Sequence, residues 1–231
     1  MKYALLNGCK THIDDVKKGT IGYDCWFTKN KVKACKGCYL QYWKYESEHP
    51  ELPSGYENET EWHIAWKRAI KDEFCEVILG PNNEHRADIK TAKYVIELQY
   101  SPIDILVAKE RSDFYEKTTH RRLIWVVNVY KSYRKKIIKT EKISSERNRF
   151  LVNWAHQKEW VVTLCGQKNV NVFLDISPTA DNLILLWRHQ DQLYGKWVKK
   201  EVFYDTYLKS VGKSKDKFLE CIKNIDIQKF L

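Results

Sequence analysis

The chain has 231 residues, of which 43% are hydrophobic and 30% are charged. This composition is typical of a folded domain with a real core, and it excludes a largely disordered chain. Lysine and arginine total 40 against 30 acidic residues, so the formal net charge is +10. That excess favours an anionic partner such as nucleic acid, although a basic surface kept for solubility is the simpler alternative.

Membrane insertion and secretion are not expected. No run of about 18 apolar residues is present, and the apolar stretch at the N-terminus is too short for a secretory signal. The seven cysteines are an odd number, and Cys75, Cys165 and Cys221 lie in or beside apolar stretches, as reduced core cysteines do. We therefore expect a cytoplasmic protein without a disulfide framework.

Residues 1–55 are predicted to form a small N-terminal, cysteine-containing module. Short strands are expected near 20–28 and 31–35, and the loop at 49–55, with two prolines and a glycine, marks its end. A C-x-x-H pair and a C-x-x-C pair together offer a tetrahedral zinc set: Cys9, His12, Cys35 and Cys38. Metal-free, reduced thiols are the favoured alternative.

Residues 57–73 are predicted to form a helix. Trp62, Ala65, Trp66, Ala69 and Ile70 recur at three- and four-residue steps and make one apolar stripe. Beside that stripe stand three polar residues spaced four apart, which a helix would project from one side, a turn apart: Glu59, His63 and Lys67.

An antiparallel meander is predicted next, with strands over 74–79, 84–90 and 94–101. A helix should follow from 101 to about 117, capped by Ser101 with Pro102 at its first position. The apolar run 123–129 is then expected to be a strand covered on both faces, returning by a parallel crossover. The predicted core, residues 56–130, is thus an α/β core in the order helix, three strands, helix, strand.

The strongest chemical signal is a pair of carboxylates on two adjacent strands of this core. Asp88 lies in one strand, and Glu97 lies in its neighbour with Gln99 on the same side. A carboxylate flanked by apolar residues in mid-strand is costly unless it is paired or bound to metal. We expect these two to share one divalent ion, Mg²⁺ or Mn²⁺, that activates a water molecule and polarises a phosphate.

The neighbouring polar side chains fit the same chemistry. Gln99 would orient the water or contact the phosphate, and Glu59 would reach the metal directly or through water. His63 and Lys67 would supply positive charge to the phosphate. Taken one residue at a time, the favoured explanation is a surface ion pair for Asp88 or Glu97 and an exposed helix face for Glu59, so the prediction depends on the joint pattern.

Four separated motifs carry a family resemblance: Glu59-x-x-x-His63, Arg86-Ala87-Asp88-Ile89, Ile96-Glu97-Leu98-Gln99-Tyr100-Ser101 and Arg111-x-x-x-Tyr115. Over about residues 20–130 the chain resembles the competence protein CoiA-like nucleases of the PD-(D/E)xK, restriction-endonuclease-like superfamily. The resemblance implies the αβββαβ core, Asp88 and Glu97 as metal ligands, Glu59 as the helix-borne acid and His63 as the helical histidine. Gln99 then fills the position usually held by lysine. The resemblance also implies that Arg86, Ser101, Arg111 and Tyr115 occupy recurrent positions, of which the first three, with Lys67, are our expected nucleic-acid contacts.

Residues 131–231 are predicted to be an α+β extension packed on the core. We expect a lysine-rich connector over 131–142, a helix over 145–157, strands over 160–165, 170–176 and 183–188, and helices over 201–210 and 215–228. The connector carries a basic run that either tracks a nucleic-acid backbone or is simply a solvated surface: Lys131, Arg134, Lys135, Lys136 and Lys139.

The main functional hypothesis is a Mg²⁺- or Mn²⁺-dependent DNA nuclease, an endodeoxyribonuclease acting on phosphodiester bonds of single- or double-stranded DNA, as a monomer or a homodimer. An alternative is a catalytically weak or inactive DNA-binding accessory protein for recombination or phage-related DNA processing. A third is a zinc-stabilised module with a protein partner. The matched carboxylates favour the first hypothesis, while Gln99 leaves the second open.

Overall fold

The computed structural model describes residues 1–25, 29–36, 41–47, 59–82, 84–100, 102–143, 148–155 and 159–226. The chain forms two compact units, Met1–Glu59 and Thr60–Leu231. None of the helices in these ranges is both long and apolar enough to cross a lipid bilayer.

The N-terminal unit is an antiparallel sheet in the order β2-β1-β3-β4-β5. Its core is small: alternate residues Val32 and Ala34 of β4 pack with Ile13 and with Trp43 of β5. Only β3 and β4 match the strands expected from the sequence. The strands are β1 (Tyr3–Leu6), β2 (Cys9–His12), β3 (Ile21–Tyr23), β4 (Lys31–Lys36) and β5 (Gln41–Tyr45).

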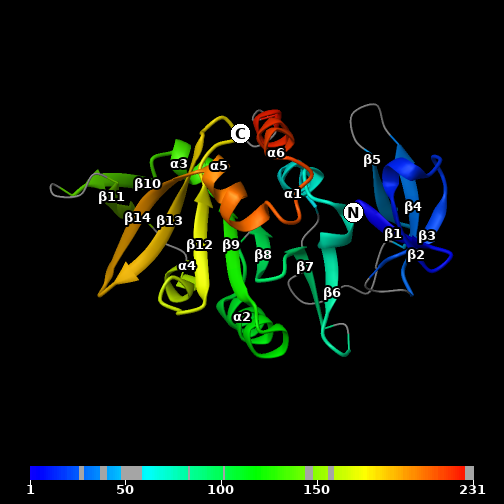
Figure 1. Ribbon diagram of the computed structural model, residues 1–231, viewed down its shortest axis with the longest axis horizontal. Helices are drawn as coiled ribbons and strands as arrows, with labels where there is room; N and C mark the ends of the chain where they lie inside the picture. Colours follow the sequence, from blue (N-terminus) through cyan, green and yellow to red (C-terminus); the bar gives the residue numbers. More distant parts are fainter. Residues whose placement is uncertain are drawn as a thin grey trace. The chain divides into compact units, whose positions relative to one another are not determined.

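The second unit is built on one mixed sheet in the order β10-β11-β14-β13-β12-β9-β8-β7-β6, labelled in Figure 1. The pairs β8–β9 and β9–β12 are parallel, and the other neighbours are antiparallel. The strands are β6 (Cys75–Leu79), β7 (His85–Lys90), β8 (Tyr94–Gln99), β9 (Arg122–Asn128), β10 (Ile138–Lys142), β11 (Arg149–Trp154), β12 (Val170–Asp175), β13 (Asn182–His189) and β14 (Gln192–Lys199).

Helices cover both faces of this sheet. Successive side chains of β9 point to opposite faces of the sheet, and on one face Leu123, Trp125 and Val127 pack in a cluster with α2 and α4. On β12, Phe173 instead contacts Phe203 of α5, which also packs against α1. The helices are α1 (Glu61–Arg68), α2 (Ile105–Thr119), α3 (Tyr130–Arg134), α4 (Glu159–Leu164), α5 (Lys200–Phe203) and α6 (Lys215–Lys223), with a π-helical turn at Tyr204–Leu208.

The element order α1, β6, β7, β8, α2, β9 is the predicted helix, three strands, helix, strand, and the predicted parallel crossover from β8 to β9 is present. The fold is therefore the mixed α/β architecture expected of a nuclease-like core. The sheet continues past β9, because β12 pairs with the other edge of β9 and brings β10, β11, β13 and β14 with it.

Both helix starts differ from the predicted ones. The first helix begins at Glu61, because Thr60 caps it: its hydroxyl accepts from the amide of His63. The second begins at Ile105 with Asp104 as its cap, because the Asp104 carboxylate accepts from the amide of Leu106 at 2.7 Å. The proposed cap, Ser101, lies outside the described residues.

Three predictions in the C-terminal part were wrong. The connector over 131–142 holds α3 and β10, and the expected helix over 145–157 is replaced, in its described part, by β11. The expected strand over 160–165 is α4. Apolar runs of four to six residues suit a buried strand or a buried helix equally, so periodicity alone did not separate them.

Candidate active site

Asp88 lies where β7 and β8 separate. The described ladder between these strands ends at the pair Ile89–Ile96. Beyond it, the amide of Leu98 donates to Asp88 Oδ2 at 2.9 Å. The Asp88 carboxylate thus takes a hydrogen bond that a backbone carbonyl would otherwise accept, and its other oxygen, Oδ1, faces the Lys67 ammonium at 3.4 Å. The Asp88 side chain is 22% exposed, so this carboxylate is partly accessible to solvent.

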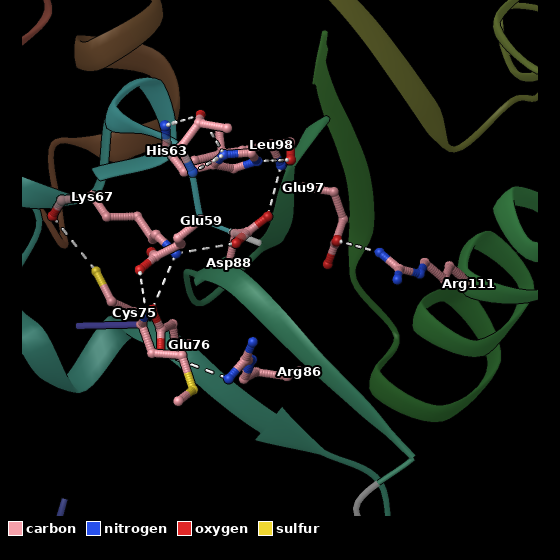
Figure 2. Close-up of polar contacts among 12 residues, drawn as sticks. Glu59, His63, Lys67, Cys75, Glu76, Arg86, Asp88, Glu97, Leu98 and Arg111 are labelled. Carbon is pink, nitrogen blue, oxygen red and sulfur yellow. Dashed lines mark hydrogen bonds and ion pairs between the residues drawn. The ribbon is translucent and has the colours of Figure 1, made fainter. Parts of the chain in front are cut away.

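Glu97 is held from the side of α2. Tyr115 donates its hydroxyl hydrogen to Glu97 Oε1 at 2.7 Å, and Arg111 donates to Oε2 at 3.1 Å. Figure 2 shows Glu97 pointing toward Arg111 and Asp88 lying on the other side of it, near Lys67. The sequence expected Arg111 at a nucleic-acid contact; here its guanidinium is the counter-ion of Glu97.

Electrostatics connect the two carboxylates. Burial raises the pKa of Glu97 from 4.5 to about 7; Arg111 opposes that rise, and the charge of Asp88 adds to it. Burial, with the Glu97 charge next, also raises the pKa of Tyr115 well above its usual value. Asp88 is therefore close enough for its charge to disfavour ionisation of Glu97, and a divalent cation relieves such repulsion.

A lysine and a third carboxylate complete the polar cluster. Lys67 Nζ is 3.1 Å from Glu76 Oε1 and 3.4 Å from Asp88 Oδ1. Arg86 NH1 lies 3.9 Å from the other oxygen of Glu76. Lys67 and Arg86 were predicted as nucleic-acid contacts, whereas in this structure both are held by carboxylates.

Glu76 also has an unusual backbone. Its φ is +49°, in the left-handed region that a long side chain rarely adopts. Such a conformation costs on the order of 1–3 kcal/mol and persists only where the surroundings enforce it, commonly at functional sites.

His63 connects α1 to β8. Its Nε2 lies 2.9 Å from the carbonyl oxygen of Leu98, so this nitrogen carries the donated proton. Its Nδ1 then accepts from the amide of Thr60 at 3.2 Å. This pattern is that of a neutral imidazole, whereas the sequence led us to expect a source of positive charge. The same backbone segment, at Leu98, therefore bonds both His63 and Asp88.

The other predicted site residues are distributed differently. Gln99 is buried at the end of β8, two residues from Glu97. Glu59 precedes the cap of α1, so it does not share a helical face with His63 and Lys67. It belongs to the N-terminal unit, where its Oε2 lies 3.7 Å from the amine of Met1. Its role as a metal ligand stays a prediction. Ser101 is outside the described residues.

The described part of the chain holds no group of three or more His, Cys, Asp or Glu side chains placed to bind a metal ion. For the zinc set this has a topological reason: Cys9 is on β2 and Cys35 on β4, with β1 and β3 between them. His12 instead accepts from the amide of Asp14 at 3.2 Å. Cys38 lies outside the described residues.

Sequence reasoning missed Glu76, although the signal was present. It is a single carboxylate in the strand Cys-Glu-Val-Ile-Leu, the same apolar context that singled out Asp88 and Glu97. It also missed Asp175, which is fully buried at the end of β12. Asp175 accepts from the indoles of Trp62 and Trp66 and pairs with Lys200. Through those two indoles Asp175 fixes α1, and with it His63 and Lys67.

The fold and this cluster of acidic and basic side chains define a nuclease-like α/β protein. The family described as "competence protein CoiA, nuclease-like domain" matches residues 75–193, more than half of the chain. The chain belongs to this family. The match runs past residue 130, where the expected resemblance ended, and so includes β10 to β13. No curated protein and no solved structure gives a significant match.

Proposed function

We propose that this protein is a metal-dependent nuclease that hydrolyses phosphodiester bonds in DNA. One observation carries the proposal. Where β7 and β8 part, inside a nuclease-like domain, Asp88 lies close enough to the buried Glu97 for its charge to raise the pKa of Glu97. Two carboxylates placed so that the charge of one disfavours ionisation of the other are a suitable place for a divalent cation.

The donor set suits Mg²⁺ or Mn²⁺. These ions take one or two carboxylates and complete their coordination with water and phosphate oxygens, so three protein ligands are not required. Asp88 and Glu97 would hold the ion. When bound, such an ion polarises the scissile phosphate and lowers the pKa of a coordinated water.

The groups around the two carboxylates fix their orientation and add positive charge. Arg111 and Tyr115 fix the orientation of Glu97, and the Leu98 amide fixes that of Asp88. Lys67 brings a positive charge to within 3.4 Å of Asp88, where it favours a phosphate. Gln99 is uncharged, so it can orient a water or a phosphate oxygen but cannot neutralise charge.

A basic surface near the same sheet edge supports DNA as the substrate. The parallel strands β8 and β9 end side by side at Gln99 and Val127, and α3 follows β9 directly. From Lys117 to Thr140 the sequence has no acidic residue. Tyr130 is buried and Tyr133 packs on the core, which leaves exposed the side chains of Lys131, Arg134, Lys135 and Lys136.

The test is cleavage of plasmid and of single-stranded DNA by the purified protein with Mg²⁺, Mn²⁺ or EDTA. We expect cleavage only with metal, and a loss of at least about 100-fold in Asp88→Asn and Glu97→Gln. Asp113→Asn is the matched control, because Asp113 is an exposed acidic residue of α2. Full cleavage by Asp88→Asn would exclude this centre.

DNA binding without cleavage is the second candidate, and one observation favours it. Lys67 and Arg111 already act as counter-ions to Asp88 and Glu97, so the carboxylates are partly neutralised without a metal. This candidate predicts salt-dependent DNA binding that is unchanged in Asp88→Asn, with no cleavage in any metal.

A further inference from the structure

The Lys67–Glu76 pair is the most deeply buried ion pair beside the candidate catalytic carboxylates. The side chains are 3% and 2% exposed, and Nζ is 3.1 Å from Oε1. Lysine is almost never buried unless it is paired. Here the ammonium pairs with the carboxylates of Glu76 and Asp88, and Figure 2 shows it lying between them.

The placement of Glu76 is specific. On β6 it lies between the paired residues Cys75 and Val77, whose partners Ile89 and Ala87 flank Asp88 on β7. Glu76 and Asp88 therefore occupy facing positions of two adjacent strands. The left-handed φ of +49° falls at Glu76 alone within β6. A conformation this rarely adopted is retained only where the surroundings enforce it.

Lys67 supplies what Gln99 lacks. Phosphodiester hydrolysis spreads negative charge over the phosphate oxygens, and a fixed cation stabilises that charge. Gln99, on the strand that carries Glu97, is uncharged. The ammonium that reaches the site comes from α1 instead.

We propose that Lys67 is the cationic catalytic residue of this site and that Glu76 is the positioning residue that holds the Lys67 ammonium beside Asp88. This inference rests on the proposed nuclease function and names the residues that serve it. The simpler possibility is that Glu76 only neutralises a lysine buried for structural reasons. The positioning role and the purely structural role differ in a testable way. Replacing both members of a buried ion pair by apolar residues often leaves the free energy of unfolding unchanged or raises it, so stability and activity can be separated.

The experiment compares Lys67→Met, Glu76→Gln, Glu76→Asp and the double variant Lys67→Met/Glu76→Met, which removes both charges of the pair. Kinetics on a DNA oligonucleotide with Mg²⁺ and thermal unfolding are measured for each. The control pair is Lys117→Met/Asp113→Asn, which removes an exposed ion pair of α2.

We expect Lys67→Met to lower kcat at least about 100-fold. Glu76→Gln should lower kcat about 10- to 100-fold with little change in KM, as loss of a supporting residue does. Glu76→Asp keeps the carboxylate, and aspartate tolerates the left-handed region better than glutamate, so it should recover much of the loss. The double variant should unfold at a higher temperature than either Lys67→Met or Glu76→Gln and remain inactive.

A second readout needs no activity. The ¹H–¹⁵N signal of the Lys67 ammonium should be protected from exchange with water in the wild type, absent in Lys67→Met, and exchange at least about tenfold faster in Glu76→Gln, since opening of the pair governs exchange. Wild-type kcat in the double variant, or an unchanged ammonium signal in Glu76→Gln, would overturn the inference alone. A wild-type protein that cleaves no DNA overturns the nuclease proposal and the catalytic role of Lys67 together.

Discussion

Replacing Glu97 by glutamine should make the metal-free protein more stable relative to the wild type as the pH rises. Glutamine has nearly the shape of glutamate and still accepts from Tyr115, but it carries no charge. The pKa of Glu97 is raised from 4.5 to about 7, first because the group is buried and further because of Asp88, against the opposing effect of Arg111. An ionised Glu97 therefore opposes folding.

The size of the effect follows from the two pKa values. One pKa unit corresponds to about 1.4 kcal/mol, so a carboxyl group whose pKa rises from 4.5 to about 7 on folding destabilises the ionised protein by about 3 kcal/mol. Because the folded pKa is the higher one, the stabilising contribution is fully present below pH 4.5 and is lost as the pH rises through 7. The free energy of unfolding of Glu97→Gln minus that of the wild type should therefore grow by about 3 kcal/mol over this range.

The assay is urea unfolding of both proteins in EDTA at several pH values across this window. Stability curves that stay parallel with pH would refute the reasoning, since glutamine at 97 cannot titrate. Mg²⁺ provides a second arm: at a concentration of about 100 times its Kd it should stabilise the wild type by about 2.7 kcal/mol, and Glu97→Gln by much less. Equal stabilisation of both proteins would show that the ion binds elsewhere.

Three further predictions concern the scaffold and the basic surface. Asp175→Asn leaves Lys200 buried without its counter-ion, so it should lower the free energy of unfolding by about 3–5 kcal/mol in urea titrations. The double variant Asp175→Asn/Lys200→Met should largely reverse this loss, and no recovery would contradict this account. Gly195→Ala places a Cβ 2.5 Å from a ring carbon of Phe150 and 2.8 Å from a methyl of Ile184. It should therefore lower the free energy of unfolding by about 1–3 kcal/mol in the same assay. A neutral result would show that β14 can shift. Replacing Lys131, Arg134, Lys135 and Lys136 by serine should reduce the slope of log K against log salt for duplex DNA by up to about 4 in fluorescence anisotropy, since each phosphate contact contributes about 0.9. Lys217→Ser/Lys223→Ser on α6, whose side chains pair with Glu220 and Asp181, is the control; an unchanged slope in the first variant would remove α3 from the DNA path.

The central order of elements was predictable because each carried its own local signal. The two-residue alternation of β8, the apolar run of β9 and the turn residues around Gly80 are properties of neighbouring residues, so they can be read without tertiary structure. The strands carrying Asp88 and Glu97 followed from the same signals. The C-terminal part was predicted less well, since Trp160 to Leu164 forms a helix where an apolar run fits either element.

Bond partners at the site were decided by packing between distant segments. Nothing near Glu97 in the sequence indicates that Arg111 and Tyr115 neutralise and orient it, and the spacing of Glu59 from His63 suggested a shared helical face that the Thr60 cap removes.

The amino-acid sequence alone was enough to predict the order of helices and strands in the core, because the spacing of apolar residues is a local property. It was also enough to predict which strands carry carboxylates, because the cost of a charge in an apolar strand depends on neighbouring residues. Only the tertiary structure decided which cation meets which anion. Lys67 and Glu76 are nine positions apart on a helix and a strand, and their pairing depends on how α1 packs against the sheet, a consequence of the buried contacts of Trp62 and Trp66 with Asp175 far along the chain.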